Sequence, residues 1–265
     1  MRTRSAFVTI GLLCVASSQA AFSLNHNGSV VDIDETQARI NNWFVGGVDN
    51  VFDHSYWFRV GDAGNAARVS TISAGAVTMF SPRAAEVVYA DASWRVTISY
   101  LLTASSNGLM ADLTESVLVE NLGGSAALRF FQYSDWDMNG TAANDTATRL
   151  NSSTISMVDG AFSGINSVHG GTPIPDFTEI ALFPSTINNI DTTNGYNLNT
   201  AAGGGIGQQI SGDVAYWFQW NRNLGQGGSF VMSTNKVAAV PEPASMIALG
   251  LGAAALLARK RRKAA

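Results

Sequence analysis

Apolar and polar residues alternate with a period of two along most of this chain. In Arg95–Leu102, Leu113–Glu120 and Val214–Trp220, one of the two alternating sets of residues is mainly apolar. Successive side chains of a β-strand point to opposite faces of the sheet, so this period predicts half-buried antiparallel strands. The turn signals Asn107-Gly108 and Asp159-Gly160 fall between such segments.

Shorter segments extend the same pattern. Further strands are expected at Ser29–Ile33, Tyr56–Val60, Val69–Ser73, Val77–Phe80, Val87–Ala90, Ala127–Tyr133, Thr154–Val158, Thr178–Phe183 and Ser229–Ser233. A single short helix is expected at Asp34–Trp43, and a polar, Gly-rich surface loop at Asn188–Gly207. Many short strands at hairpin spacing predict an all-β fold, an antiparallel β-sandwich or a related barrel.

The two ends of the chain break the alternation. Residues 1–20 have a positive start at Arg2 and Arg4, an apolar centre, and small residues before Ala21. This order is typical of a secretory signal peptide, and we expect signal peptidase to cleave between Ala20 and Ala21. Cys14, the only cysteine, lies inside this segment, so the mature protein is expected to contain no disulfide.

The C-terminal end combines three signals in order. Pro241-Glu242-Pro243 breaks regular structure, residues 244–258 form an uncharged apolar run, and residues 259–263 are all basic. As a helix the apolar run measures about 22 Å, against a hydrocarbon core of about 30 Å. The basic block would remain in the cytoplasm and the body outside. We therefore divide the chain into a signal peptide (1–20), an exported domain (21–236), and a linker with a membrane tail (237–265).

This tail resembles that of the PEP-CTERM proteins, which are predicted substrates of exosortase. The resemblance implies recognition near Pro241, Glu242 and Pro243 by an exosortase-type enzyme, followed by removal of the apolar helix. From the residues alone, an ordinary single-span anchor remains the alternative. The segments Tyr56–Gly64, Leu128–Thr141 and Gly212–Phe230 also resemble parts of PEP-CTERM proteins of unassigned function, and that likeness implies a shared β domain without an activity.

Charge narrows the range of partners. Between residues 21 and 240 there are nine Lys and Arg against 19 Asp and Glu, a net charge of 9 − 19 = −10, whereas the full chain carries −4. Binding to nucleic acid depends on basic patches, so an acidic body argues against it.

One motif suggests a metal site. Asp135, Asp137 and Asn139, followed by Gly140, match the first half of an EF-hand calcium loop, in which alternate oxygens face one ion. The twelfth position is Thr146 instead of the usual bidentate Glu, so Asp145 or a carbonyl near Thr141 would have to complete the shell. The alternative is a hairpin turn at Asn139-Gly140 with two solvated aspartates.

The remaining candidates are weaker. The pairs Asp32 with Asp34 and Asp135 with Asp137 each share a strand face, but no hydrolase signature surrounds them. Trp217 and Trp220 differ in parity, so one of them is expected to point away from the core, either as a platform for a sugar or packed under a loop.

These features predict a non-catalytic exported protein. Calcium is the only candidate cofactor, and we expect no other. We expect it to be anchored transiently in the inner membrane and then placed at the cell envelope, or in the extracellular matrix with exopolysaccharide. A carbohydrate-binding module and a secreted glycoside-active enzyme remain the alternatives.

Overall fold

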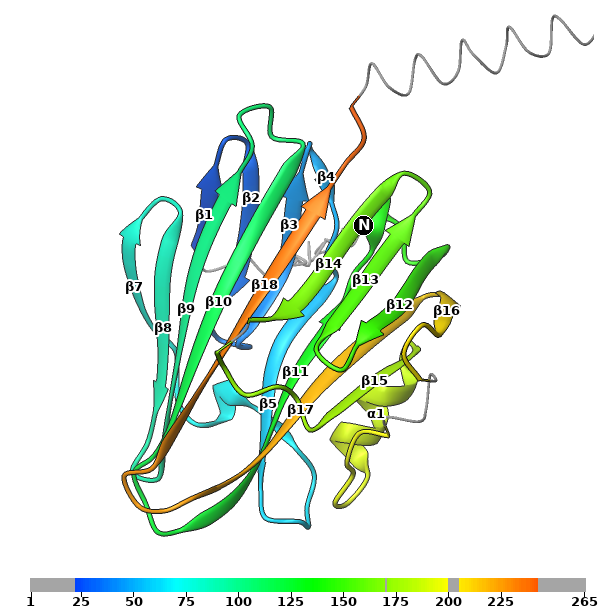
Figure 1. Ribbon diagram of the computed structural model, residues 1–265. Helices are drawn as coiled ribbons and strands as arrows, with labels where there is room; N and C mark the ends of the chain where they lie inside the picture. The colour runs from blue at the N-terminus through cyan, green and yellow to red at the C-terminus, as the bar shows by residue number, and fades with distance from the viewer. Residues whose placement is uncertain (1–21, 170, 200–204, 243–265) are drawn as a thin grey trace, which may run out of the picture.

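The computed structural model describes residues 22–169, 171–199 and 205–242 and shows two antiparallel sheets that face each other across one core (Figure 1). Every strand pairing in both sheets is antiparallel. The all-β antiparallel architecture expected from the alternation is therefore confirmed.

The first sheet, sheet A, has seven strands in its main path and two short strands beside it. In spatial order these are β1 (Phe22–His26), β2 (Ser29–Asp34), β3 (Arg39–Val45), β5 (Asp53–Val60), β11 (Ala126–Asp135), β17 (Val214–Leu224) and β15 (Phe177–Leu182), with β4 (Val48–Asp49) beside β3 and β6 (Ala67–Arg68) beside β5.

The second sheet, sheet B, has nine strands. In spatial order these are β16 (Gln209–Gly212), β12 (Asp145–Asn151), β13 (Thr154–Asp159), β14 (Phe162–Val168), β18 (Ser229–Ala239), β10 (Met110–Asn121), β9 (Trp94–Ala104), β8 (Ala84–Ala90) and β7 (Ala76–Ser81). The last of the described strands, β18, thus lies inside the sheet, between β14 and β10. Several strands are longer than expected: β10 has 12 residues, and β9, β17 and β18 have 11 each.

The main core fills the space between the sheets. Side chains from the inner faces of both sheets meet there, among them Trp43, Phe130, Ile98 and Met232, all fully buried. Burying apolar area of this kind stabilises a fold by roughly 25 cal/mol per Å².

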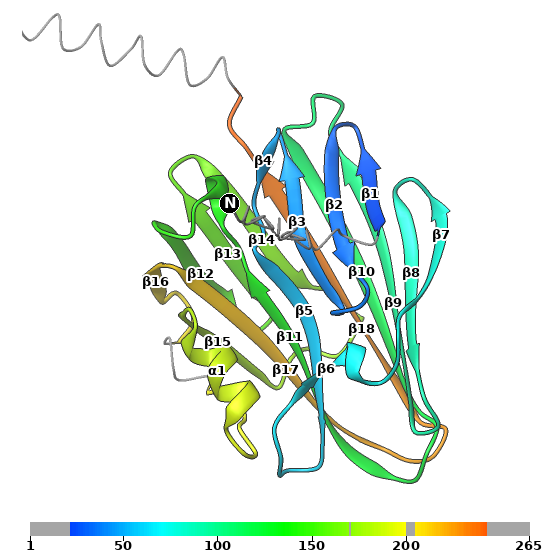
Figure 2. The ribbon, with the colours of Figure 1, turned by 180° about the vertical axis from the view of Figure 1, so that it is seen from behind.

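A second cluster lies on the outer face of sheet A. It contains Trp57, Phe131, Tyr133 and Trp217, and it is covered by Ile190 of the helix α1 (Ser185–Thr192), with Leu198 also buried in it. Figure 2 shows α1 lying over β15 and β17 on the side away from sheet B. Because both faces of β17 are covered, the segment from Val214 to Trp220 is buried at every position.

Four expectations about local structure are corrected. Asp34–Trp43 is a hairpin between β2 and β3 and not a helix: β3 pairs with β2 and β5, and its Ile40 and Trp43 are buried in the main core. Val69–Ser73 contains a short 3-10 helix, η1 (Val69–Thr71), instead of a strand. The polar stretch Asn188–Gly207 begins inside α1 and is only partly a loop.

The fourth correction concerns the expected linker. Val237, Ala238 and Ala239 belong to β18 and pair with β10, so the strand continues to the edge of the tail. The expected signal peptide and apolar segment (244–258) lie outside the described residues. Within the described residues, no helix combines the length and the apolar character that crossing a membrane requires.

Candidate functional site

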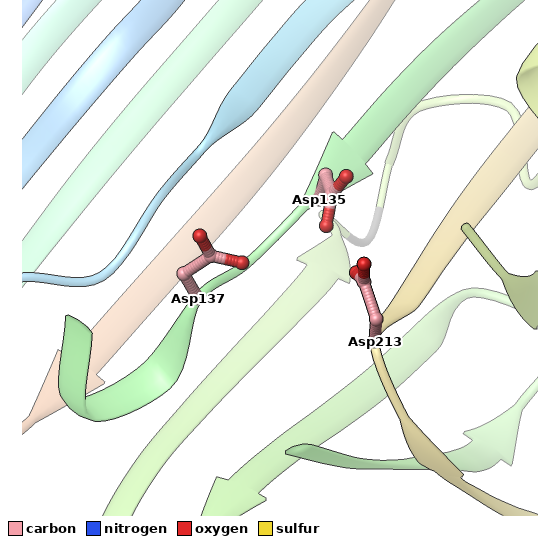
Figure 3. A group of neighbouring side chains, drawn as sticks. All are labelled: Asp135, Asp137 and Asp213. Carbon is pink, nitrogen blue, oxygen red and sulfur yellow. The ribbon is translucent and has the colours of Figure 1, made fainter. Parts of the chain in front are cut away.

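Three carboxylates meet on the outer face of sheet A, where β11 ends and β17 begins. Asp135 is the last residue of β11 and pairs with Ala215 of β17. Antiparallel pairing runs in opposite directions along the two strands, so two residues further on Asp137 faces Asp213. Figure 3 shows the three side chains turned toward one another.

The carboxylates are close enough to share a ligand. One oxygen from each of Asp135, Asp137 and Asp213 lies within 4.8 Å of the corresponding oxygens of the other two. Asp135 is only 1 % exposed, and the hydroxyl of Tyr133 donates a 2.9 Å hydrogen bond to its Oδ2. Its other oxygen, Oδ1, is buried and accepts no hydrogen bond. Leaving a buried carboxylate oxygen unsatisfied is costly.

The electrostatics of the group are unfavourable in the absence of a cation. Burial raises the pKa of Asp135 to about 7; the hydrogen bond from Tyr133 opposes the shift, and the charges of Asp137 and Asp213 add to it. Burial also raises the pKa values of Asp137 and Asp213. Asp145, fully buried, has its pKa raised to about 8 by burial first and then by Asp137. The fold thus holds several carboxylates in a place that disfavours their charged form.

Two exposed phenyl rings flank the carboxylates. The backbone N–H of Phe52 donates to the carbonyl of Asp135, and that of Phe183 donates to the carbonyl of Asp213. The two rings lie edge to face, 6.1 Å between centroids, and are 49 % and 36 % exposed. Together with Ala142 and the carboxylates they line a pocket of about 100 Å³. Pockets for drug-sized ligands are usually about 300–1,000 Å³, so this one is of the size of an ion and a few waters.

The structure separates the residues of the calcium-loop motif found in the sequence. Asp135 and Asp137 stay together, but Asn139 lies in the 3-10 helix η2 (Met138–Gly140) with a left-handed φ of 62°. Its amide is directed to the carboxylate of Asp159, at 3.5 Å, instead of to Asp135 or Asp137. The twelfth position of the motif, Thr146, lies in β12 and hydrogen-bonds Ser211.

The sequence did not point to Asp213. It is 76 residues beyond Asp137, and only the register of β11 with β17 brings the two side chains together. The one available signal in the sequence was that the alternation of Val214–Trp220 begins at Val214, which places Asp213 directly before a strand.

None of the six tryptophans offers an exposed platform. Trp217 and Trp220 do point to opposite faces, as their parity predicted, but Trp217 is packed in the cluster under α1 and Trp220 lies in the main core; both are fully buried. The other four, Trp43, Trp57, Trp94 and Trp136, are at most 7 % exposed. Asp32 accepts hydrogen bonds from Ser23 and Asn42, and Asp34 accepts one from Thr36.

A second group of charges lies inside the main core. Glu115 accepts hydrogen bonds at Oε2 from His54 Nε2 (3.0 Å) and the Tyr56 hydroxyl (2.8 Å), and Lys236 Nζ donates to the same oxygen. The other ring nitrogen of His54, Nδ1, is 2.8 Å from the hydroxyl of Ser134. His54, Glu115 and Lys236 are at most 2 % exposed.

The pKa values follow from this burial. Burial by itself would raise the pKa of Glu115, but the charges and hydrogen bonds of His54 and Lys236 outweigh it and hold that pKa well below its usual range. Burial lowers the pKa of His54, and this effect is larger than the opposite effect of the negative charge of Glu115, which raises that pKa. A neutral His54 has one N–H, and it must lie on Nε2, because Glu115 only accepts hydrogen bonds.

The start of the tail adjoins the fold. The backbone N–H of Val240 donates a 2.9 Å hydrogen bond to the carbonyl of Leu109, and its side chain packs against the main core. Pro241 is half-buried and Glu242 is exposed. Pro243, and the expected cleavage pair Ala20 and Ala21, lie outside the described residues.

A family model for the PEP-CTERM protein-sorting motif matches residues 239–263. The chain therefore carries this motif, as its tail predicted, and the motif implies an exported protein that is anchored in the membrane before an exosortase-type enzyme processes it. A comparison with curated protein sequences gives no match.

Several solved structures share the fold. A bacterial glucoamylase complexed with acarbose has a TM-score of 0.61 at 10 % identity, over 89 % of this chain and 34 % of that one. A putative aldose 1-epimerase from Escherichia coli K12 has a TM-score of 0.53 at 11 % identity, over 83 % and 99 %. A polysaccharide lyase has a TM-score of 0.51 at 13 % identity, over 81 % and 32 %. This chain spans about a third of the glucoamylase and of the lyase, and at these identities the likeness shows the fold alone.

Proposed function

We propose that this chain is an exported protein whose two-sheet domain acts, without catalysis, at the cell envelope or in the extracellular matrix with exopolysaccharide. In this proposal the tail anchors the newly exported chain in the inner membrane through the apolar segment 244–258. The sorting enzyme then cuts near Pro241–Pro243 and leaves the domain outside.

The observation that carries the proposal is the junction between the domain and the motif. β18 ends at Ala239 and Val240 is fixed to Leu109, so the sorting motif begins where the fold ends. Only residues 241–243 separate Val240 from the apolar segment, a reach of about 10 Å. The domain would thus be held directly against the membrane, and a cut at the motif leaves every described strand and every described core residue in the exported domain.

The site geometry supports a non-catalytic role. The carboxyl groups of retaining glycosidases stand about 5–5.5 Å apart and those of inverting enzymes about 6.5–9.5 Å, on either side of the bond that breaks. Here one of the three carboxylates is only 1 % exposed, and the pocket beside them measures about 100 Å³. A sugar ring flanked by two carboxylates does not fit such an arrangement.

The sorting half of the proposal is tested by mass spectrometry of the protein from its native host. The expected chain ends between Val240 and Ala244. A mature envelope fraction that contains only chains ending at Ala265 would contradict sorting by cleavage. A variant with Pro241→Ala and Pro243→Ala should accumulate uncut in the membrane.

The non-catalytic half is tested by incubating the protein with the host exopolysaccharide. No new reducing ends are expected, and their appearance at a rate that falls in Asp137→Asn would identify a glycoside-active enzyme.

Carbohydrate binding is the second candidate, and the exposed pair Phe52 and Phe183 is the observation that favours it, because aromatic faces stack on sugar rings. Phe183→Ala should then weaken co-sedimentation with the polysaccharide. Phe80→Ala is the matched control, since Phe80 is 65 % exposed on the edge strand β7. Equal retention by both variants would exclude this pair as the binding platform.

A further inference from the structure

We propose that Asp135, Asp137 and Asp213 bind one calcium ion, which joins the end of β11 to the start of β17. This site differs from the contiguous loop in the sequence, because Asp213 takes the place that Asn139 would have had. It lies in the exported domain and does not depend on the sorting tail.

The distances suit this ion. Calcium is coordinated by oxygens at about 2.3–2.6 Å, so two oxygens on one ion lie at most about 4.6–5.2 Å apart. The three carboxylate oxygens lie within 4.8 Å of one another. The group contains only oxygen donors, which are the ligands of calcium and magnesium, whereas zinc sites usually include His or Cys.

A buried oxygen without a hydrogen bond, Oδ1 of Asp135, is a second observation that favours a bound cation, besides the closeness of the three carboxylates. Asp135 Oδ1 is buried without any hydrogen bond, and Figure 3 shows the carboxylate turned toward Asp137 and Asp213. Asp145 lies nearby, fully buried, and neither of its carboxylate oxygens accepts a hydrogen bond of normal geometry. A cation at the three aspartates would satisfy the orphan oxygen of Asp135 and attract the charge of Asp145.

The charges of the group have no partner in an ion pair within the part of the chain that the structure describes. Among the described residues, no ion pair involves Asp135, Asp137, Asp145 or Asp213, although Asp53, on the neighbouring strand, is paired with Arg68. Like charges this close repel, and only protons or a bound cation offset the repulsion. Phe52 and Phe183, which also line the pocket, are 49 % and 36 % exposed, so the pocket lies next to solvent.

The test uses terbium and calcium on the full chain after treatment with EDTA. Tyr133 donates a hydrogen bond to Asp135, and its ring lies 4.5 Å from that of Trp217 between centroids, so terbium bound at the site should show sensitised emission. Calcium should quench this emission by displacement, with half-saturation at about 10⁻⁴–10⁻³ M, the range of extracellular calcium modules. It should also raise the melting temperature.

Four variants make the test specific. Asp137→Asn and Asp213→Asn should weaken binding at least about tenfold, which is the effect of removing one charged ligand from a small set. Their calcium-free melting temperatures should equal or exceed that of the wild type, since one repelling charge is lost. Asn139→Ala should bind as the wild type does. Asp191→Asn is the matched control, because Asp191 is exposed on α1, away from the site.

Two results would overturn the proposal. One is the absence of terbium emission and of any melting shift up to about 10 mM calcium, well above the affinities of extracellular modules. The other is loss of binding in Asn139→Ala while Asp213→Asn still binds, which would restore the contiguous loop. Equal stabilisation by magnesium would show that the site takes either hard cation and does not select calcium as proposed.

Discussion

Replacing Lys236 by Met should destabilise the fold, and the loss of stability should be larger at high pH than at low pH. Lys236, Glu115 and His54 form a charged group in the centre of the main core, each at most 2 % exposed. Methionine keeps the unbranched shape of the lysine stem and removes the ammonium group. Breaking a buried ion pair by removing one partner costs about 3–5 kcal/mol, because the other charge stays buried without compensation.

His54 determines how the loss caused by Lys236→Met depends on pH. In the wild type its pKa lies below the unfolded value of about 6.5, so stability is lost as the pH falls below that value. The charge of Lys236 is one cause of the lowered pKa. Without Lys236, His54 can take up a proton and pair with Glu115 at 3.0 Å, so we expect its folded pKa to rise above 6.5.

A raised pKa stabilises the fold below the unfolded pKa, and this contribution is lost as the pH rises through the folded pKa. The loss caused by Lys236→Met should therefore be larger at about pH 8 than at about pH 5.5, by about 1.4 kcal/mol for each unit of the pKa change that falls between these two pH values.

Urea denaturation, followed by tryptophan fluorescence at both pH values, measures this effect. The difference between variant and wild type removes the contribution of other titrating groups, including the aspartates. The double variant Lys236→Met with Glu115→Gln serves as control: it has neither charge and should recover at least half of the loss. A loss below about 1 kcal/mol, or the same loss at both pH values, would refute the reasoning.

Two glycines give further predictions. A Cβ on Gly164 would lie 2.0 Å from Cζ3 of the fully buried Trp136, so Gly164→Ala should lower the free energy of unfolding by about 3 kcal/mol, and a loss under about 1 kcal/mol would contradict this packing. Gly46 and Gly47 both have positive φ, but only a Cβ on Gly46 would clash with Val240. Gly46→Ala should therefore lower the melting temperature and increase proteolysis at the tail junction more than Gly47→Ala does; equal effects would mean that Val240 is not fixed there.

Local patterns were sufficient for most strands. The alternations in Arg95–Leu102 and Leu113–Glu120 correspond to β9 and β10, because half-buried strands require one apolar face whatever their partners. Local patterns failed at Asp34–Trp43, where the choice lies between a helix and a strand. Ile40 and Trp43 are three residues apart, which is a helical spacing, and both are buried in β3 because its register with β2 shifts between them. The partners β2 and β5 decide between the two, since a helix of ten residues is marginal by itself.

The candidate site shows the same division. Asp135 and Asp137 were identified from the sequence, since they are close neighbours in a metal-loop spacing. Asp213 and the core group of His54, Glu115 and Lys236 were not, because their members are separated by 61 residues or more and meet only through strand pairing and sheet packing.

The sequence by itself thus determined the β class, the acidic character and the sorting tail, because periodicity, charge and a contiguous motif are properties of neighbouring residues. The tertiary structure alone decided which strands are adjacent, that α1 buries the outward-facing Trp217, and that β18 continues to the sorting motif. It also decided which carboxylates meet. The register between distant strands is set by the whole apolar core, and no short stretch of the chain contains that information.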